Sequence, residues 1–81
     1  MRIPTVHING TGKEMLVRGY EEAHRALREA GRALRKIEFN PRDYYVQGPD
    51  AWREAVKEMA ERCTAIGKVE KDIEDILIAL D

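Results

Sequence analysis

The stretch that decides the fold is LVRGYEEAHRALREAGRALRKI, which runs from Leu16 to Ile37. Its apolar and small residues recur at alternating intervals of four and three, the spacing of one face of a long amphipathic helix with a heptad repeat. These positions are Leu16, Tyr20, Ala23, Leu27, Ala30, Leu34 and Ile37. Because no proline interrupts the stretch, a single helix is expected.

The residues just before this stretch predict where the helix begins. Thr11-Gly12-Lys13-Glu14 matches a capping box, in which the Thr hydroxyl accepts a hydrogen bond from the third helical amide while the Glu carboxylate accepts one from the cap amide. The first helix is therefore expected over residues 11–37. Residues 1–10 alternate β-branched with polar residues and end in an Asn-Gly turn signal, which predicts a short extended arm.

Residues 38–49 hold two of the three prolines and two of the three tyrosines, a composition that predicts a structured loop. A second helix is expected over 50–80, with Gly48 or Asp50 as its N-cap. Its apolar stripe can continue through Val69 or through Glu70, so a small change of phase is expected near Gly67. The stripe comprises Trp52, Val56, Met59, Cys63, Ile66, Val69 or Glu70, Ile73, Ile76 or Leu77, and Leu80.

Together these segments predict an all-α fold: one domain over 1–81, folded as an antiparallel two-helix hairpin with an N-terminal arm. Two helices leave each apolar stripe only partly covered, so the hairpin is expected to be completed by oligomerisation with further copies. Small residues seven apart, at Gly19, Ala26 and Ala33, would let a neighbouring helix approach closely.

Composition narrows the classes of function. No apolar run approaches the ~20 residues of a membrane-spanning helix, and the N-terminus resembles no signal peptide, so a cytoplasmic protein without membrane contact is expected. One cysteine and two histidines offer neither a disulfide nor a standard zinc site, and no catalytic triad is visible. We therefore expect a non-enzymatic protein without cofactor or metal. Residues 12–37 carry a charge of +3 and residues 50–81 a charge of −4, and the net charge of −1 argues against nucleic-acid binding, which is typical of basic domains.

The loop concentrates side chains suited to ligand binding. Tyrosine rings stack on nucleobases, an arginine fork holds phosphate, and amide groups can read base edges. The loop candidates are Asn40, Arg42, Tyr44, Tyr45 and Gln47. Two interpretations stay open, because Tyr44 and Tyr45 would also cap the end of the hairpin core, with Asp43 pairing with Arg42.

Further candidates lie on the arm and on the first helix. Tyr20 lies in the apolar stripe of the first helix, so it belongs to the core or stacks on a base at a subunit junction. The arginine stripe of the first helix, Arg25, Arg28, Arg32 and Arg35, is either a solvated face or a phosphate-binding one. The candidates outside the loop are His7, Asn9, Thr11, Lys13, Tyr20 and Arg35. Arm and loop lie at opposite ends of the first helix, so they would share one site only between different subunits.

Three segments resemble a family of small phage and prophage proteins, and together they cover most of the chain. They are His7-Ile8-Asn9-Gly10-Thr11, Tyr20-x-x-Ala23-x-x-Ala26-Leu27 and Arg42-Asp43-Tyr44-Tyr45-x-Gln47-Gly48. The resemblance implies a helical hairpin from a phage genome.

A second, weaker analogy of size and setting is to the anti-CBASS and anti-Thoeris sponges of phages, which sequester immune signalling nucleotides in symmetric oligomers. It implies a sponge for a cyclic nucleotide immune signal, in which tyrosines stack on bases and basic residues neutralise phosphates. The alternative hypothesis is a protein-interaction or assembly module that docks a host or phage protein, because Tyr, Trp and Arg are also the usual interface anchors.

Overall fold

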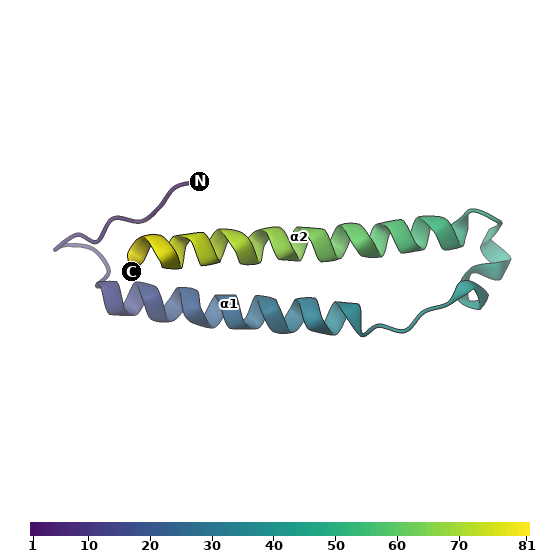
Figure 1. Cartoon of the computed structure of the whole chain (residues 1–81), viewed down its shortest axis with the longest axis horizontal. Helices are drawn as coiled ribbons and strands as arrows, with labels where there is room; N and C mark the ends of the chain where they lie inside the picture. Colours follow the sequence, from purple (N-terminus) through teal and green to yellow (C-terminus); the bar gives the residue numbers. More distant parts are fainter.

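The computed structural model describes all 81 residues and contains three helices. The first is α1 (Lys13–Arg35), the second is the short 3₁₀ helix η1 (Pro41–Gln47), and the third is α2 (Ala51–Leu80). Figure 1 shows α1 and α2 side by side in opposite directions, with η1 at the turn between them. The all-helical class is therefore confirmed. The hairpin is a rod of 60 × 21 × 17 Å.

The predicted capping box at Thr11 is wrong. The N-cap is Gly12, which is extended (φ −64°, ψ 152°), and no side chain caps α1. Because the cap lies one residue later than expected, Glu14 is only the second helical residue and its carboxylate is out of register for the box. Helix α1 is two residues shorter at each end than the expected 11–37. Residues 1–12 lie outside the helices, with a turn at Ile8–Gly10.

The face that α1 turns toward α2 differs from the predicted stripe at three points. Ala23 and Ala30 are exposed, and the neighbouring His24 and Gly31 are covered in their place. Ile37 lies beyond the end of the helix and is exposed. Besides Leu16, the covered residues follow a 3-4-3-4-3 spacing: Val17, Tyr20, His24, Leu27, Gly31 and Leu34. Gly31 lies against α2 at this point, since a Cβ built on it would be in van der Waals contact with Cγ2 of Ile66, at 3.6 Å.

The face of α2 also departs from its predicted stripe. Ala55 is buried where Val56 was expected, and the stripe continues through Glu70, leaving Val69 exposed. From Cys63 onward the spacing is a regular 3-4-3-4-3, through Ile66, Glu70, Ile73, Leu77 and Leu80. The stripe therefore keeps its phase across Gly67, where a change of phase was expected. The change of phase occurs earlier, where Ala55, Met59 and Cys63 follow one another at two successive intervals of four residues.

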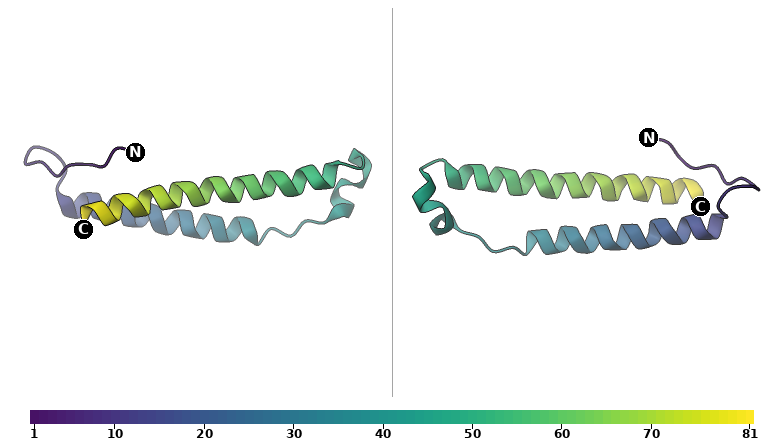
Figure 2. Two further views of the ribbon diagram at one scale, coloured as in Figure 1. Left: turned by 45° about the horizontal axis from the view of Figure 1, so that its top comes forward. Right: turned by 180° about the vertical axis from the view of Figure 1, so that it is seen from behind.

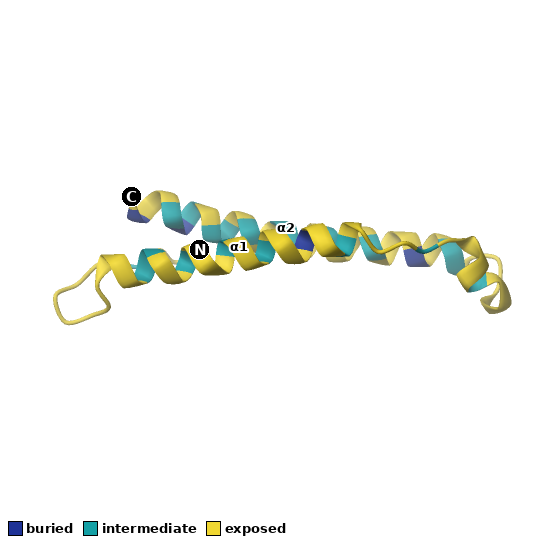
Figure 3. Ribbon diagram, turned by 90° about the horizontal axis from the view of Figure 1, so that it is seen from below, coloured by how far each residue is buried: buried dark blue, intermediate teal, exposed yellow.

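The core of the single chain is small, as the scarcity of dark blue in Figure 3 shows. The buried residues are Gly31, Ala55, Ile76 and Leu80. The chain exposes 6652 Å², whereas a compact monomer of its 9.3 kDa would expose about 5,000 Å². Neither long helix combines the length and the apolar character that crossing a membrane requires.

Candidate functional site

The tip of the hairpin is organised by a capping box at the start of η1. The Asn40 side-chain oxygen accepts a hydrogen bond from the Arg42 amide at 2.9 Å, and Asp43 Oδ2 accepts one from the Asn40 amide at 2.9 Å. Pro41, at the first helical position, has its φ already set for the helix. The Asp43 carboxylate therefore closes the box, and its expected pairing with the Arg42 guanidinium is wrong.

Three aromatic rings pack together beneath this tip. The Phe39 ring centroid lies 5.2 Å from that of Trp52 and 6.5 Å from that of Tyr44, and the rings of Tyr44 and Trp52 lie 6.0 Å apart. Tyr44 thus caps the end of the hairpin core, as one of the two interpretations held. Tyr45 points outward instead and is 70% exposed, next to Val46, which is 97% exposed.

A hollow of about 390 Å³ lies beside the two tyrosines. Its lining residues are Pro41, Tyr44, Tyr45, Gly48, Pro49 and Trp52. Gly48 shapes one side with a φ of 112°, which only glycine adopts readily. Of the loop candidates, Asn40, Arg42 and Gln47 stay outside this hollow.

A second hollow, of about 400 Å³, is basic. Its lining residues are Arg28, Arg32, Arg35, Lys36 and Glu70. Arg28 is partly neutralised, because its Nε lies 3.7 Å from Oε1 of Glu70 on the facing helix. The remaining three cations have no carboxylate partner within ion-pair distance. Arg25, from the same predicted stripe, lies outside the hollow.

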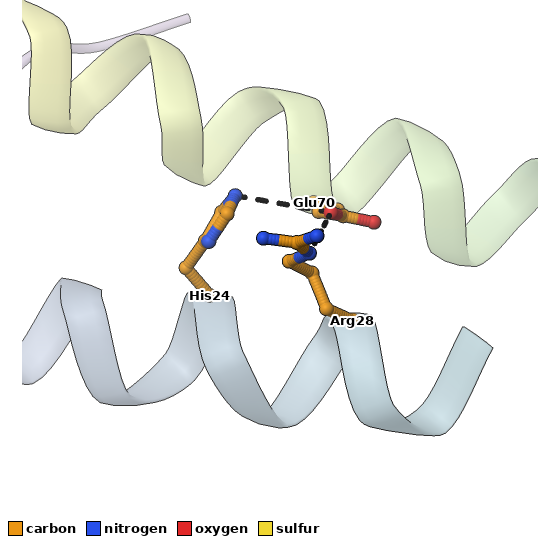
Figure 4. A network of polar contacts seen from close by, with 3 residues as sticks. All are labelled: His24, Arg28 and Glu70. Carbon is orange, nitrogen blue, oxygen red and sulfur yellow. Dashed lines mark ion pairs between the residues drawn. The ribbon is translucent and has the colours of Figure 1, made fainter. Parts of the chain in front are cut away.

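Glu70 also faces a histidine across the helix pair, as Figure 4 shows. His24 Nε2 lies 3.8 Å from Glu70 Oε1, and this nitrogen is buried without a hydrogen-bond partner. The predicted apolar stripe of the first helix contains Ala23 and not His24, so the inward position of His24 was not predicted. The available signal was the 4-3 spacing from Tyr20 through His24 to Leu27, which fits a helix face as well as the predicted 3-4 spacing through Ala23.

The third hollow, of about 770 Å³, lies at the open end of the hairpin and contains Lys13. It lies between the start of α1 and the end of α2. Its lining residues are Lys13, Glu14, Val17, Arg18, Glu21, Glu74, Leu77, Ile78 and Asp81.

The remaining candidates do not gather into a site. His7 Nδ1 accepts a hydrogen bond from the Asn9 amide at 3.1 Å, which serves the turn of the arm. His7, Asn9 and Thr11 are exposed, and none of them lines a hollow. Tyr20 is half-buried between the helices. Within one chain, the predicted residues are therefore dispersed. Arg35, Lys13 and the pair Tyr44 and Tyr45 line three separate hollows, and the other candidates line none of the three.

Lys71 and Asp75 form the shortest ion pair, on the exposed face of α2, with Nζ and Oδ1 2.7 Å apart. The hydrogen bond to Asp75 and the charge of that carboxylate raise the pKa of Lys71 above 10.5. Since the raised pKa lies in the alkaline range, the contribution of this pair to stability is present at neutral pH and is lost only as the pH rises through that pKa.

Comparison of the chain with protein-family models, with curated proteins and with solved structures gives no match in any of the three. The function therefore has to be argued from the residues themselves.

Proposed function

We propose that this chain is a non-enzymatic binding protein that acts as a homo-oligomer of hairpins and sequesters a cyclic nucleotide. The observation that carries the proposal is the basic hollow. Four cationic side chains gather there around one opening with a single carboxylate, in a chain whose net charge is −1. The anti-defence role against a bacterial immune signal is part of the same proposal and rests on the analogy to phage sponges.

The chemistry of this hollow suits phosphodiesters. Each phosphate of a cyclic nucleotide carries one negative charge, and the planar fork of a guanidinium matches two phosphate oxygens. Arg32 and Arg35 are both free of ion pairs, so they can bind an anion without first releasing a partner. Among the four cations that line the hollow, only Arg28 lies within ion-pair distance of Glu70.

Oligomerisation would bring base-stacking groups to these phosphates. The basic hollow and the tyrosine hollow share no residue, and in the proposed oligomer the tyrosines of one copy lie beside the basic hollow of another. The large exposed area supports this assembly, because only four residues of the isolated chain are buried. Exposed small residues along α1, at Gly19, Ala23, Ala26, Ala30 and Ala33, leave space for a neighbouring helix.

Native mass spectrometry of the purified chain with cyclic dinucleotides, cyclic trinucleotides and cyclic ADP-ribose isomers tests the proposal. An oligomer that retains one of these ligands at fixed stoichiometry is expected. Binding by the Arg32→Gln/Arg35→Gln variant should weaken about tenfold per arginine, since a charge-assisted hydrogen bond contributes about 1.5–3 kcal/mol. Arg25→Gln/Arg62→Gln removes the same charge from exposed positions outside the hollow and serves as the matched control. Equal losses in both variants, or no retained ligand, would contradict the proposal.

A second candidate function, docking to a host or phage protein, is favoured by one observation at the tip. Tyr45 and Val46 are adjacent and highly exposed, with no contact that explains an aromatic and an aliphatic side chain there. If this function holds, Tyr45→Ala abolishes capture of a partner protein while Gln47→Ala on the same short helix leaves it intact. The nucleotide panel then gives no bound ligand.

A further inference from the structure

We propose that the N-terminal arm of one copy docks into the hollow at the open end of a second copy, between the start of α1 and the end of α2. The inference rests on the self-association proposed above and is independent of nucleotide binding. It assigns an occupant to the largest hollow of the molecule.

The arm is an apolar segment that is only partly covered in the single chain. Ile3, Val6 and Ile8 are exposed, the last of them to 93%. Residues 1–9 form no hydrogen bond to α1 or α2, and the bonds within the arm only close the turn, with the Gly10 amide donating to the His7 carbonyl at 3.0 Å. Figure 2 shows the arm looping out beyond the open end of the hairpin and then turning back, so that the N-terminus lies alongside the end of α2.

The hollow complements the arm in both polarity and charge. Its floor is apolar, formed by Val17, Leu77 and Ile78, and Ile78 is 65% exposed. Its rim carries four carboxylates against two cations, an excess of two negative charges. The arm carries Arg2 and no acidic residue. An apolar, positively charged segment therefore fits an apolar, negatively charged hollow.

Two observations favour the arm of another copy over the chain's own arm. No residue of the arm lines the hollow of its own chain. In addition, the exposed area exceeds that of a compact monomer by about 1,700 Å², which is about twice the 800 Å² that each partner buries in a standard interface. A reciprocal exchange uses such a surplus, since each chain gives one arm and receives one.

Disulfide trapping between two different chains tests the exchange. Both chains carry Cys63→Ser; one also carries Val6→Cys, and the other carries Ile78→Cys together with an affinity tag. After mixing and mild oxidation, a covalent heterodimer is expected on a non-reducing gel. Val56→Cys, exposed on the same helix but outside the hollow, replaces Ile78→Cys as the matched control and should give little product.

A charge placed in the arm gives the second measurement. Val6→Asp/Ile8→Asp should lower the subunit number in native mass spectrometry, whereas Val46→Asp at the equally exposed tip should not. A wild-type chain that is monomeric at every concentration contradicts both this inference and the proposed assembly. If Val6→Asp/Ile8→Asp keeps the subunit number of the wild-type oligomer and no cross-link forms between chains, the arm exchange alone is overturned. The exchange is also overturned if a single chain that carries both Val6→Cys and Ile78→Cys forms a cross-link only within itself.

Discussion

Gly31 is the one buried glycine, and the space around it makes its effect on stability predictable. A methyl group at Gly31 would lie 3.5 Å from Arg35 Nη1 and 3.6 Å from Ile66 Cγ2, which is ordinary van der Waals contact. The helices thus leave room for alanine here and for nothing larger.

Gly31→Ala should raise the free energy of unfolding by about 0.5–1 kcal/mol, because alanine favours the helix and fits the space. Thermal unfolding at fixed protein concentration should show a Tm several degrees higher, at about 4–8 °C per kcal/mol. Gly31→Leu should instead lower the stability by about 1–3 kcal/mol through overpacking. Gly67→Ala, with open space around it, is the control for helix propensity alone. A lower Tm for Gly31→Ala would mean that the helices are packed more tightly than described.

His24 predicts a gain in stability when its polarity is removed. Its Nε2 is buried without a hydrogen bond, and the nearest carboxylate oxygen lies 3.8 Å away. His24→Leu should therefore raise the free energy of unfolding by about 1 kcal/mol, since an unsatisfied buried polar group costs about 1–3 kcal/mol. Chemical denaturation measures the difference, with Arg25→Leu on the exposed face as the control. A loss of stability in His24→Leu would show that the contact with Glu70 stabilises the hairpin more than its geometry indicates.

At the scale of elements, the two capping motifs show what the sequence could predict and what it could not. Thr11-x-x-Glu14 and Asn40-x-x-Asp43 both fit the pattern, yet only the second forms a box. Pro41 fixes the backbone at the start of η1, whereas no proline stands beside Thr11, and the extended N-cap of α1 is Gly12. Both segments carry the residue types of a capping box. Only the segment whose backbone is constrained by a neighbouring proline forms one.

The helices themselves were predictable from periodicity, but their facing surfaces were less so. Ala23 and His24 are neighbours, and hydrophobicity alone favours the alanine for the interface. In the structure Gly31 is buried and His24 is half-buried on the side of α1 that faces α2, while Ala23 is exposed. The basic hollow likewise depends on how Glu70 is placed between the helices, a choice that the spacing on α2 left open.

The capping box of η1 should control the order of the whole tip. Asn40→Ala removes the acceptor of the Arg42 amide, which costs about 0.5–2 kcal/mol for a typical N-cap. Because Phe39 and Tyr44 pack on Trp52 from either side of this box, the fluorescence of the single tryptophan should shift to longer wavelength. Gln47→Ala, at the other end of η1, should leave the spectrum unchanged. An unaltered spectrum in Asn40→Ala would mean that the rings hold the tip without the box.

At the scale of the whole molecule, the dominant feature is an excess of surface. A radius of gyration of 18.3 Å compares with about 12 Å for a compact domain of this length. The apolar stripes of α1 and α2 cover each other along one line only, and the flanks of that line remain open to solvent or to another copy.

If the folded hairpin is stabilised by association, its Tm must depend on protein concentration. For a dimer that unfolds to monomers, each tenfold increase in concentration adds about 1.4 kcal/mol to the apparent stability of the assembly. Thermal unfolding over a hundredfold range of concentration should therefore give a Tm that rises by several degrees. Val6→Asp/Ile8→Asp should flatten this dependence. A constant Tm in the wild-type chain would show that the hairpin is stable alone.

The two long helices are joined at one end only, and this sets the order in which the hairpin closes. The contact of Phe39 with Trp52 bridges 13 residues of chain, that of Gly31 with Ile66 bridges 35, and the Arg28–Glu70 pair bridges 42. Because the entropy lost in closing a loop grows with its length, the contacts near η1 form most readily. The contacts between α1 and α2 then form in order of their distance from the tip. The opposite end is the last to close and the first to fray. An arm of another copy docked at that end would therefore hold together the part of the hairpin that opens most often.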